Sequence, residues 1–331
     1  MVEAMVSSVK NVASALMLGV LMFVLSGCGA DAPYPNKTIT IVCPWAAGGG
    51  TDRLSRFIAA DLKKRLGVPC VVANRTGGKG AVGHSYGANA RPDGYTITMG
   101  TFELSTMHWM GISPLTYQDF TPLMQLNADA AALFVKADSP WADVSALFDE
   151  IKSKPKAIKM SGTATGGAWD LARAGMMLTA DVPVDDVIWV PSQGSAPSIK
   201  ELLGGHVDVV CCSLPEAAAQ VQNGSLRALC VMAAERHPDF PGVPTLEESG
   251  VSWDALGWRA LLLPKDIPAE VADLLRTACH EIVQSEAFHA FMEKNGFAVD
   301  IKQGDDLLTY LAQQDAQWES VIAEVGYAAA P

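Results

Sequence analysis

Two glycine-rich segments hold the residues best suited to binding a small anion. Residues 46–52 (AAGGGTD) and residues 161–167 (SGTATGG) each stand between an apolar run and a helical pattern. The amides at a helix start lack intrahelical partners, and the helix dipole favours a negative charge there. Glycines allow close approach to the main chain, and the hydroxyls of the second segment are donors suited to a carboxylate. The pattern predicts an anion site, and its structural alternatives are a tight turn and a solvated loop.

Two other motif matches are weaker. Residues 78–83 fit GxGxxG, but the preceding apolar run ends several residues too early for a dinucleotide site. Residues 83–87 fit GxSxG, the esterase nucleophile pattern, with Ser85 as the serine. A glycine-rich loop and a helix start surround Ser85, where the motif requires a strand end. Chance explains this match better, and a secreted serine hydrolase using Ser85 stays as an alternative.

Phosphate, metal and cofactor sites find little support. Residues 46–52 lack the Gly-Lys-Ser/Thr ending of a P-loop, and Asp52 would repel a triphosphate. The sequence has no CxxC pair and no HExxH spacing. Most cysteines after residue 28 lie in apolar runs, which favours buried free thiols, although disulfides stay open. We predict no metal and no cofactor.

The composition narrows the class of partner. The chain has 331 residues, of which 49% are hydrophobic, enough for one large or two ordinary domains. Its 24 Lys and Arg residues stand against 36 Asp and Glu residues, for a net charge of -12. This charge repels a phosphate backbone, so a nucleic-acid partner is not expected. The negative net charge is compatible with small molecules and proteins as partners.

The first residues are typical of an export signal. Residues 12–25 form an apolar stretch that is short for a bilayer span but suits the core of a signal peptide. Residues 25–28 (LSGC) follow at once and resemble the bacterial lipobox, whose cysteine receives a diacylglycerol. We predict a signal peptide over 1–27, a lipid on Cys28 that anchors the chain to the bilayer, and a tether over 28–34. A plain signal or a short anchor helix is the alternative.

Beyond the tether, short β-branched runs alternate with helical patterns, which is typical of βαβ units around a mainly parallel sheet. Two blocks each open with a strand, a loop and a helix, which predicts two α/β lobes with the ligand beyond the carboxyl ends of the strands. Strands are expected at 38–43, 70–73, 95–99, 157–160, 188–190, 207–212 and 226–232. Helices are expected at 51–66, 169–178, 268–285, 286–295 and 305–325.

The chain after the signal resembles the solute receptors of tripartite tricarboxylate transporters, the Bug receptor family. The resemblance runs through nearly all of this length in order, and no single piece decides it. It rests on residues 34–35 (YP), 39–42 (ITIV), 44–52 (PWAAGGGTD), 72–75 (VANR), 92–96 (PDGYT), 194–197 (GSAP), 203–208 (LGGHVD) and 244–250 (PTLEESG).

The resemblance implies a two-lobed, periplasmic-binding-protein-like (Venus flytrap) fold of class α/β, each lobe a mainly parallel sheet flanked by helices. Lobe one would comprise 35–134 and 256–331, and lobe two 135–255, with crossovers near 133–136 and 254–260. It also implies that loop amides hold a ligand carboxylate, partly through bridging waters and with no covalent chemistry.

The predicted ligand-binding residues come from the two glycine-rich segments, from the loop over 191–197 and from positions beside them. Where the family often has an aromatic and a basic residue before Gly194, this chain has Ser192 and Gln193. Where a histidine often opens the second helix, Trp169 and Asp170 stand. These departures leave the identity of the acid open. The predicted set is Trp45, Ala46, Ala47, Gly48, Gly49, Gly50, Asp52, Thr101, Ser161, Thr163, Thr165, Gly166, Gly167, Gln193, Gly194 and Ser195.

The sequence therefore predicts an extracytoplasmic receptor, on the periplasmic side or at the cell surface, and no enzyme. It would capture a small organic carboxylate between two lobes and deliver it to a membrane permease of the transporter. A ligand-sensing component of a signalling system would use the same pocket, so that alternative stays open beside the hydrolase.

Overall fold

The computed structural model describes residues 33–329, so the predicted signal peptide and Cys28 lie outside the described residues. Residues Lys37–Pro331 form one compact unit, whose described part contains every element named below. In that part of the chain, no helix combines the length and apolar character that a membrane crossing needs.

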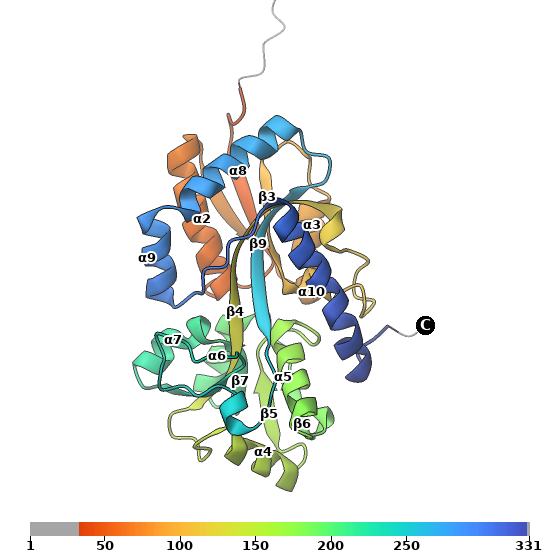
Figure 1. Ribbon diagram of the computed structural model, residues 1–331, viewed down its shortest axis with the longest axis vertical. Helices are drawn as coiled ribbons and strands as arrows, with labels where there is room; N and C mark the ends of the chain where they lie inside the picture. Colours follow the sequence, from red (N-terminus) through yellow and green to blue (C-terminus); the bar gives the residue numbers. More distant parts are fainter. Residues whose placement is uncertain (1–32, 330–331) are drawn as a thin grey trace, which may run out of the picture. The chain divides into compact units, whose positions relative to one another are not determined.

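The elements alternate between strands and helices for most of the chain (Figure 1). The strands are β1 (Ile39–Cys43), β2 (Cys70–Asn74), β3 (Thr96–Thr101), β4 (Phe120–Lys136), β5 (Ile158–Ser161), β6 (Val187–Val190), β7 (Val209–Ser213), β8 (Leu226–Val231) and β9 (Leu256–Pro264). The helices are α2 (Gly50–Leu66), α3 (Ala81–Ala88), α4 (Val144–Ser153), α5 (Ala168–Thr179), α6 (Ser195–Leu203), α7 (Leu214–Gln222), α8 (Ala269–Val283), α9 (Glu286–Asn295) and α10 (Gly304–Glu324). Short 3₁₀ turns include η1 (Gly78–Gly80) and η2 (Phe102–Ser105).

The strands form two parallel groups joined through two long strands. Their order is β2-β1-β3-β9-β4-β7-β5-β6, and β8 pairs with β4 outside this path. Strand β1 lies parallel to β2 and β3, and β5 lies parallel to β6 and β7. Strands β4 and β9 run antiparallel to their neighbours and lie side by side between the two groups (Figure 1).

Strand β4 links β9 to the group that contains β7. Its residues 120–130 pair with β9, and its residues 131–136 pair with β7 and β8. Most of its side chains are buried, and Leu133, Phe134 and Val135 are fully so. Its pairing with β9 shifts register between Pro122 and Met124, consistent with proline having no N–H for the ladder. The predicted lobe boundaries fall on these linking strands and stay a prediction.

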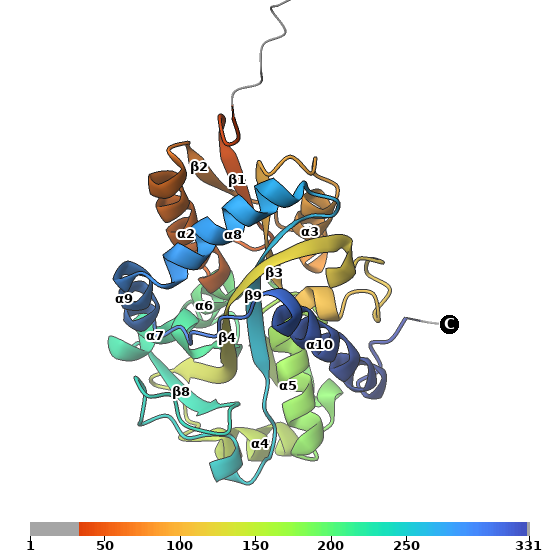
Figure 2. The ribbon, with the colours of Figure 1, turned by 45° about the horizontal axis from the view of Figure 1, so that its top comes forward.

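Helices cover the sheet and place the two glycine-rich loops. Helix α2 buries Leu54, Ile58 and Leu62 at helical spacing, so one face lies in the core, and α8 packs beside it (Figure 2). Gly67 ends α2 at φ +70°, a left-handed C-cap that favours glycine. Helix α10 contacts β4, η2 and α5. Helices α2 and α5 each start at a loop that follows a parallel strand, so both begin at the carboxyl ends of the strands.

The regular βα units match the sequence prediction closely. The strand expected at 38–43 is β1, and the helices expected at 51–66 and 286–295 are α2 and α9. Strands β4 and β9 were not predicted as strands, and α4, α6 and α7 were also missed. Apolar and polar residues do not alternate along β4 and β9, because both faces of each strand are buried.

The glycines of the GxGxxG and GxSxG matches serve the packing of α3. A Cβ on Gly83 would lie 2.7 Å from Pro44 Cα and 2.9 Å from the Arg75 carbonyl oxygen. A Cβ on Gly87 would lie 1.8 Å from Thr98 Oγ1. Helix α3 thus lies directly on the main chain after β1 and on β3, and only glycine permits this approach. Ser85 lies inside α3, away from the strand-to-helix turn that a nucleophile elbow requires.

We expect Gly83→Ala to lower the free energy of unfolding by about 1–3 kcal/mol, because the added methyl group overpacks a rigid main-chain contact. Urea unfolding of the full chain measures the change. Gly242→Ala is the matched control, since a Cβ there meets nothing within 4 Å. Equal stability of the two variants would show that α3 shifts freely, contrary to this packing.

Candidate functional site

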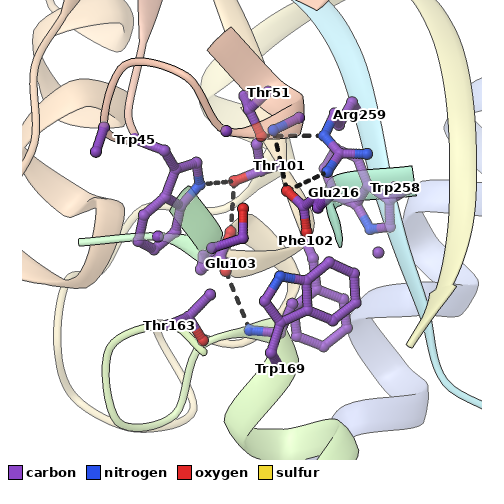
Figure 3. Close-up of a pocket in the computed structure, with 17 residues that line it drawn as sticks. Trp45, Thr51, Thr101, Phe102, Glu103, Thr163, Trp169, Glu216, Trp258 and Arg259 are labelled. Atoms are coloured by element: carbon purple, nitrogen blue, oxygen red, sulfur yellow. Dashed lines mark hydrogen bonds and ion pairs between the residues drawn. The ribbon is translucent and has the colours of Figure 1, made fainter. Parts of the chain in front are cut away.

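A cavity lies where the two strand groups meet, and residues of both groups line it (Figure 3). The starts of α2 and α5 both reach it, through Gly49, Gly50 and Thr51 on one side and Ala168 and Trp169 on the other. Its volume is about 430 Å³, including space that is open to solvent. The cavity is thus partly open and is flanked by two helix N-termini.

The first glycine-rich loop is held by its own aspartate. The Gly48 amide, at φ +89°, donates to Asp52 Oδ2 at 2.9 Å. Asp52 also accepts from Arg56 Nε at 2.9 Å and from Asn74 Nδ2 at 2.8 Å. Burial opposes ionisation of Asp52, but these hydrogen bonds outweigh it and lower its pKa. Asp52 therefore shapes the loop as a permanent anion and does not line the cavity.

The second glycine-rich loop repeats this device. The Gly166 amide, at φ +76°, donates to Asp170 Oδ2 at 2.8 Å, and Asp170 Oδ1 accepts from Arg173 Nη2 at 2.7 Å. The aspartate again stands four residues after a glycine of positive φ, in the first turn of the helix. Both loops thus carry a Gly-x-x-x-Asp spacing, a sequence signal that the motif analysis missed.

Two glutamates connect the strand groups through the helix starts. Glu103, in η2 after β3, accepts from the Ala168 amide of α5 at 3.1 Å. Glu216, in α7 after β7, accepts from the Gly50 amide of α2 at 3.1 Å. Each group therefore places a carboxylate at the N-terminus of the other group's helix, where the helix dipole favours a negative charge.

Glu103 is the more enclosed of the two glutamates at the cavity wall. Its Oε2 accepts from the Thr101 hydroxyl, and its side chain lies between Thr101 and the start of α5 (Figure 3). Only 3% of the residue is exposed, and burial raises the pKa of its carboxyl group. Two hydrogen bonds donated to its two oxygens support the ionised form against that burial.

Thr101 links Glu103 to a buried histidine. Trp45 Nε1 donates to Thr101 Oγ1 at 3.3 Å, and the Thr101 amide donates to His84 Nε2 at 3.3 Å. His84 Nδ1 lies 2.9 Å from the Gly80 carbonyl oxygen, to which it donates in this tautomer. Burial lowers the pKa of His84 to about 4, so the ring is neutral near pH 7 and positions Thr101 without adding charge.

Arg259, on β9, is the buried cation of the site. Its Nη1 lies 2.7 Å from Asp129 Oδ2, its Nη2 3.2 Å from Glu216 Oε1, and its Nε donates to Thr51 Oγ1 at 3.0 Å. The Arg259 side chain is 4% exposed, so water does not compensate its charge. Its guanidinium group is thus satisfied by the protein at all three nitrogen atoms.

Two polar groups at the wall lack such partners. Thr163 Oγ1 and Trp258 Nε1 are buried and have no hydrogen-bond partner among residues 33–329. Both residues line the cavity. An unpaired buried polar group is costly, so these two groups are candidates for contact with a bound molecule.

Half of the predicted ligand-binding residues line the cavity, and the other half do not. Ser161 donates its hydroxyl to the Val190 carbonyl oxygen at 2.7 Å, and the Gln193 carbonyl oxygen accepts from the Ala46 amide at 3.1 Å, so both are used within the protein. The predicted residues that line it are Trp45, Ala46, Gly49, Gly50, Thr101, Thr163, Gly194 and Ser195. Those that do not are Ala47, Gly48, Asp52, Ser161, Thr165, Gly166, Gly167 and Gln193.

Sequence reasoning missed most of the charged and aromatic wall. Glu103, Glu216 and Arg259 are far apart in the chain, and none belongs to a motif. Arg259 could have been found as a lone charge in the apolar run of β9, because a buried charge needs a partner. The lining residues outside the predicted set are Thr51, Phe102, Glu103, Ala168, Trp169, Glu216, Gly257, Trp258 and Arg259.

The family model of the tripartite tricarboxylate transporter family receptor matches residues 54–327. This chain belongs to that receptor family. The match confirms the resemblance seen in the sequence. It also makes the chain a solute-binding receptor and not an enzyme, so Ser85 is not a nucleophile.

Named relatives and solved structures agree over most of the receptor chain. Protein BugT of Bordetella pertussis is 27% identical over 320 residues, covering 94% of this chain and 97% of BugT. The periplasmic binding protein BugD is 27% identical with a TM-score of 0.84, covering 90% of this chain and 100% of that structure. This likeness confirms the two-lobed, periplasmic-binding-protein-like α/β fold.

Two similar structures contain a carboxylate. Rpa4515 from R. palustris, with adipate, is 28% identical with a TM-score of 0.83, covering 90% of this chain and 100% of that chain. MatC from Rhodopseudomonas palustris, with bound malate, is 25% identical with a TM-score of 0.81, covering 87% of this chain and 100% of that chain.

We expect Arg259→Met to lower the free energy of unfolding of the receptor by about 3–5 kcal/mol, because Asp129 and Glu216 would keep buried charges without a counterion. Chemical denaturation at pH 7 gives the value. The matched control is Arg236→Met, which removes an exposed ion pair with Glu248 and should cost at most about 1 kcal/mol. A loss below 1 kcal/mol for Arg259→Met would contradict the proposed role of this cation.

Proposed function

We propose that this receptor works outside the cytoplasm, closes over a small organic carboxylate between its two lobes, and delivers it to the membrane permease of its transporter. The observation that carries the proposal is that the N-termini of α2 and α5 reach one cavity from opposite strand groups. Helix N-termini are anion sites by their amides and their dipole. The presence of adipate and malate in two similar structures supports this ligand class.

The predicted ligand-binding residues enter the proposal in two roles. Those at the cavity wall contact the acid, and the Thr163 hydroxyl has no partner among residues 33–329. Those away from the wall, such as Gly48 and Asp52, hold the loops in the shape that presents the remaining amides. This division follows from the hydrogen bonds that the second group makes within the protein.

Closure would take place about the strands that link the two groups. We take 35–134 with 256–331 as lobe one and 135–255 as lobe two. The change of partner along β4, from β9 to β7 and β8, supports a hinge at this passage. A ligand that contacts both lobes favours the closed form by its differential affinity for that form.

An acid at a free concentration of 100 times its Kd should raise the free energy of unfolding by about 2.7 kcal/mol. A thermal-shift panel of mono-, di- and tricarboxylates, with mass spectrometry of ligand released on denaturation, measures this gain. Gly49→Asp should abolish the response, because its carboxylate would enter the anion site near Ser195, while aspartate at this N-cap position keeps α2 stable. Gly242→Asp, at an open position, is the control and should respond like the wild type. A retained response in Gly49→Asp would move the site elsewhere.

The membrane anchor is a separate part of the proposal and rests on the lipobox-like residues 25–28. In a bacterial host, the wild type should incorporate labelled fatty acid and sediment with membranes. Cys28→Ser should lose the label and appear in the aqueous extract, because no other thiol follows a signal-peptide core. Cys70→Ser is the control and should keep both properties. A Cys28→Ser chain that is still labelled would refute the lipid anchor at this position.

A further inference from the structure

The cavity is acidic where a receptor for dicarboxylates needs free cations or free amides. Among its described lining residues, Glu103 and Glu216 are the acidic residues and Arg259 is the single basic one. Arg259 already faces Glu216 and also Asp129 directly behind it. The wall therefore has no cation left for a second ligand carboxylate.

Glu103 stands in the place of such a carboxylate. It accepts from the Ala168 amide at the start of α5, one of the two helix N-termini at the cavity. The corresponding amide of α2, on Gly50, is taken by Glu216. The Ala168 amide of α5 is thus taken by a residue of the protein, and a ligand carboxylate beside Glu103 would meet a like charge.

The remaining requirement at Glu103 is for a donor. Its two oxygens accept hydrogen bonds from Thr101, from Ala168 and from the Glu103 amide, and two carboxylate oxygens can accept four. An ammonium group at this position would use the free lone pairs and offset the buried negative charge. Elsewhere on the wall, Thr163 and Trp258 line the cavity, and Thr163 Oγ1 and Trp258 Nε1 are buried without partners among residues 33–329.

We propose that the ligand is an amino-carboxylate, with one carboxylate and one ammonium group, and that Glu103 selects it by pairing with the ammonium group. This inference rests on the proposed function and narrows its ligand class. Glu103 is then a specificity-determining residue, which substitutes for the second carboxylate of a dicarboxylate ligand.

Titration calorimetry of the full chain at pH 7.5 tests the proposal with three matched series of four, five and six carbons. Each series holds an ω-amino acid, the diacid and the simple monoacid, such as 6-aminohexanoate, adipate and hexanoate. We expect the amino acid of at least one length to bind ten times or more tightly than both partners. Wild-type preference for the diacid or the monoacid at every length that binds would overturn the proposal and leave the receptor function standing.

Glu103→Gln keeps the shape of the side chain and removes its charge. We expect it to reduce the preference for the amino acid over the diacid at least tenfold, mainly through weaker binding of the amino acid. Glu201→Gln, on the exposed face of α6, is the matched control and should keep the wild-type ratio. A folded Glu103→Gln chain that keeps the wild-type ratio of affinities for the amino acid and the diacid would overturn the proposal. If this variant does not fold, the affinities of the wild type for the three series test the proposal. No binding of any acid, and none released from the native protein, would overturn both this proposal and the proposed function.

Discussion

The site depends on one buried cation, the guanidinium group of Arg259. Moving an ion of this size out of water costs several kcal/mol, so the charge is tolerated only where protein groups surround it. The three groups that do so come from three separate elements: Asp129 on β4, Glu216 on α7 and Thr51 in the first turn of α2. These three contacts of Arg259 therefore fix the start of α2 relative to both strand groups. They also fix the first glycine-rich loop, which leads into α2.

The two glycine-rich loops have the same local hydrogen bonding. In each, a glycine of positive φ turns the chain, and an aspartate four residues later takes its amide. This leaves the next amides free, and Glu216 and Glu103 from the opposite strand groups then accept from Gly50 and Ala168. Contacts between the strand groups are thus made through carboxylates at helix starts, the same interaction that a bound acid would use.

The sequence predicts the parts of this arrangement that depend on neighbouring residues. Strand β1, the glycine loop and α2 follow from alternation, glycine content and helical spacing within about thirty residues. Strand β4 was missed because it is buried on both faces and carries Asn127 and Asp129, which are rare in strands. Here Asp129 pairs with Arg259 and accepts a hydrogen bond from Asn127 Nδ2. The charged wall of the cavity was missed because Glu103, Glu216 and Arg259 lie far apart in the sequence. Only the folded chain brings these three side chains together.

The glutamates also bear on how the receptor responds to its ligand. A ligand shifts the open and closed populations only by the difference between its affinities for the two states. Under the proposed closure, the hydrogen bonds from the Ala168 amide to Glu103 and from the Gly50 amide to Glu216 would favour the closed form, whereas burial of the two carboxylates would disfavour it. A ligand that neutralises Glu103 would remove this cost in the closed form alone. In this proposal, that difference between the two forms couples ligand identity to closure.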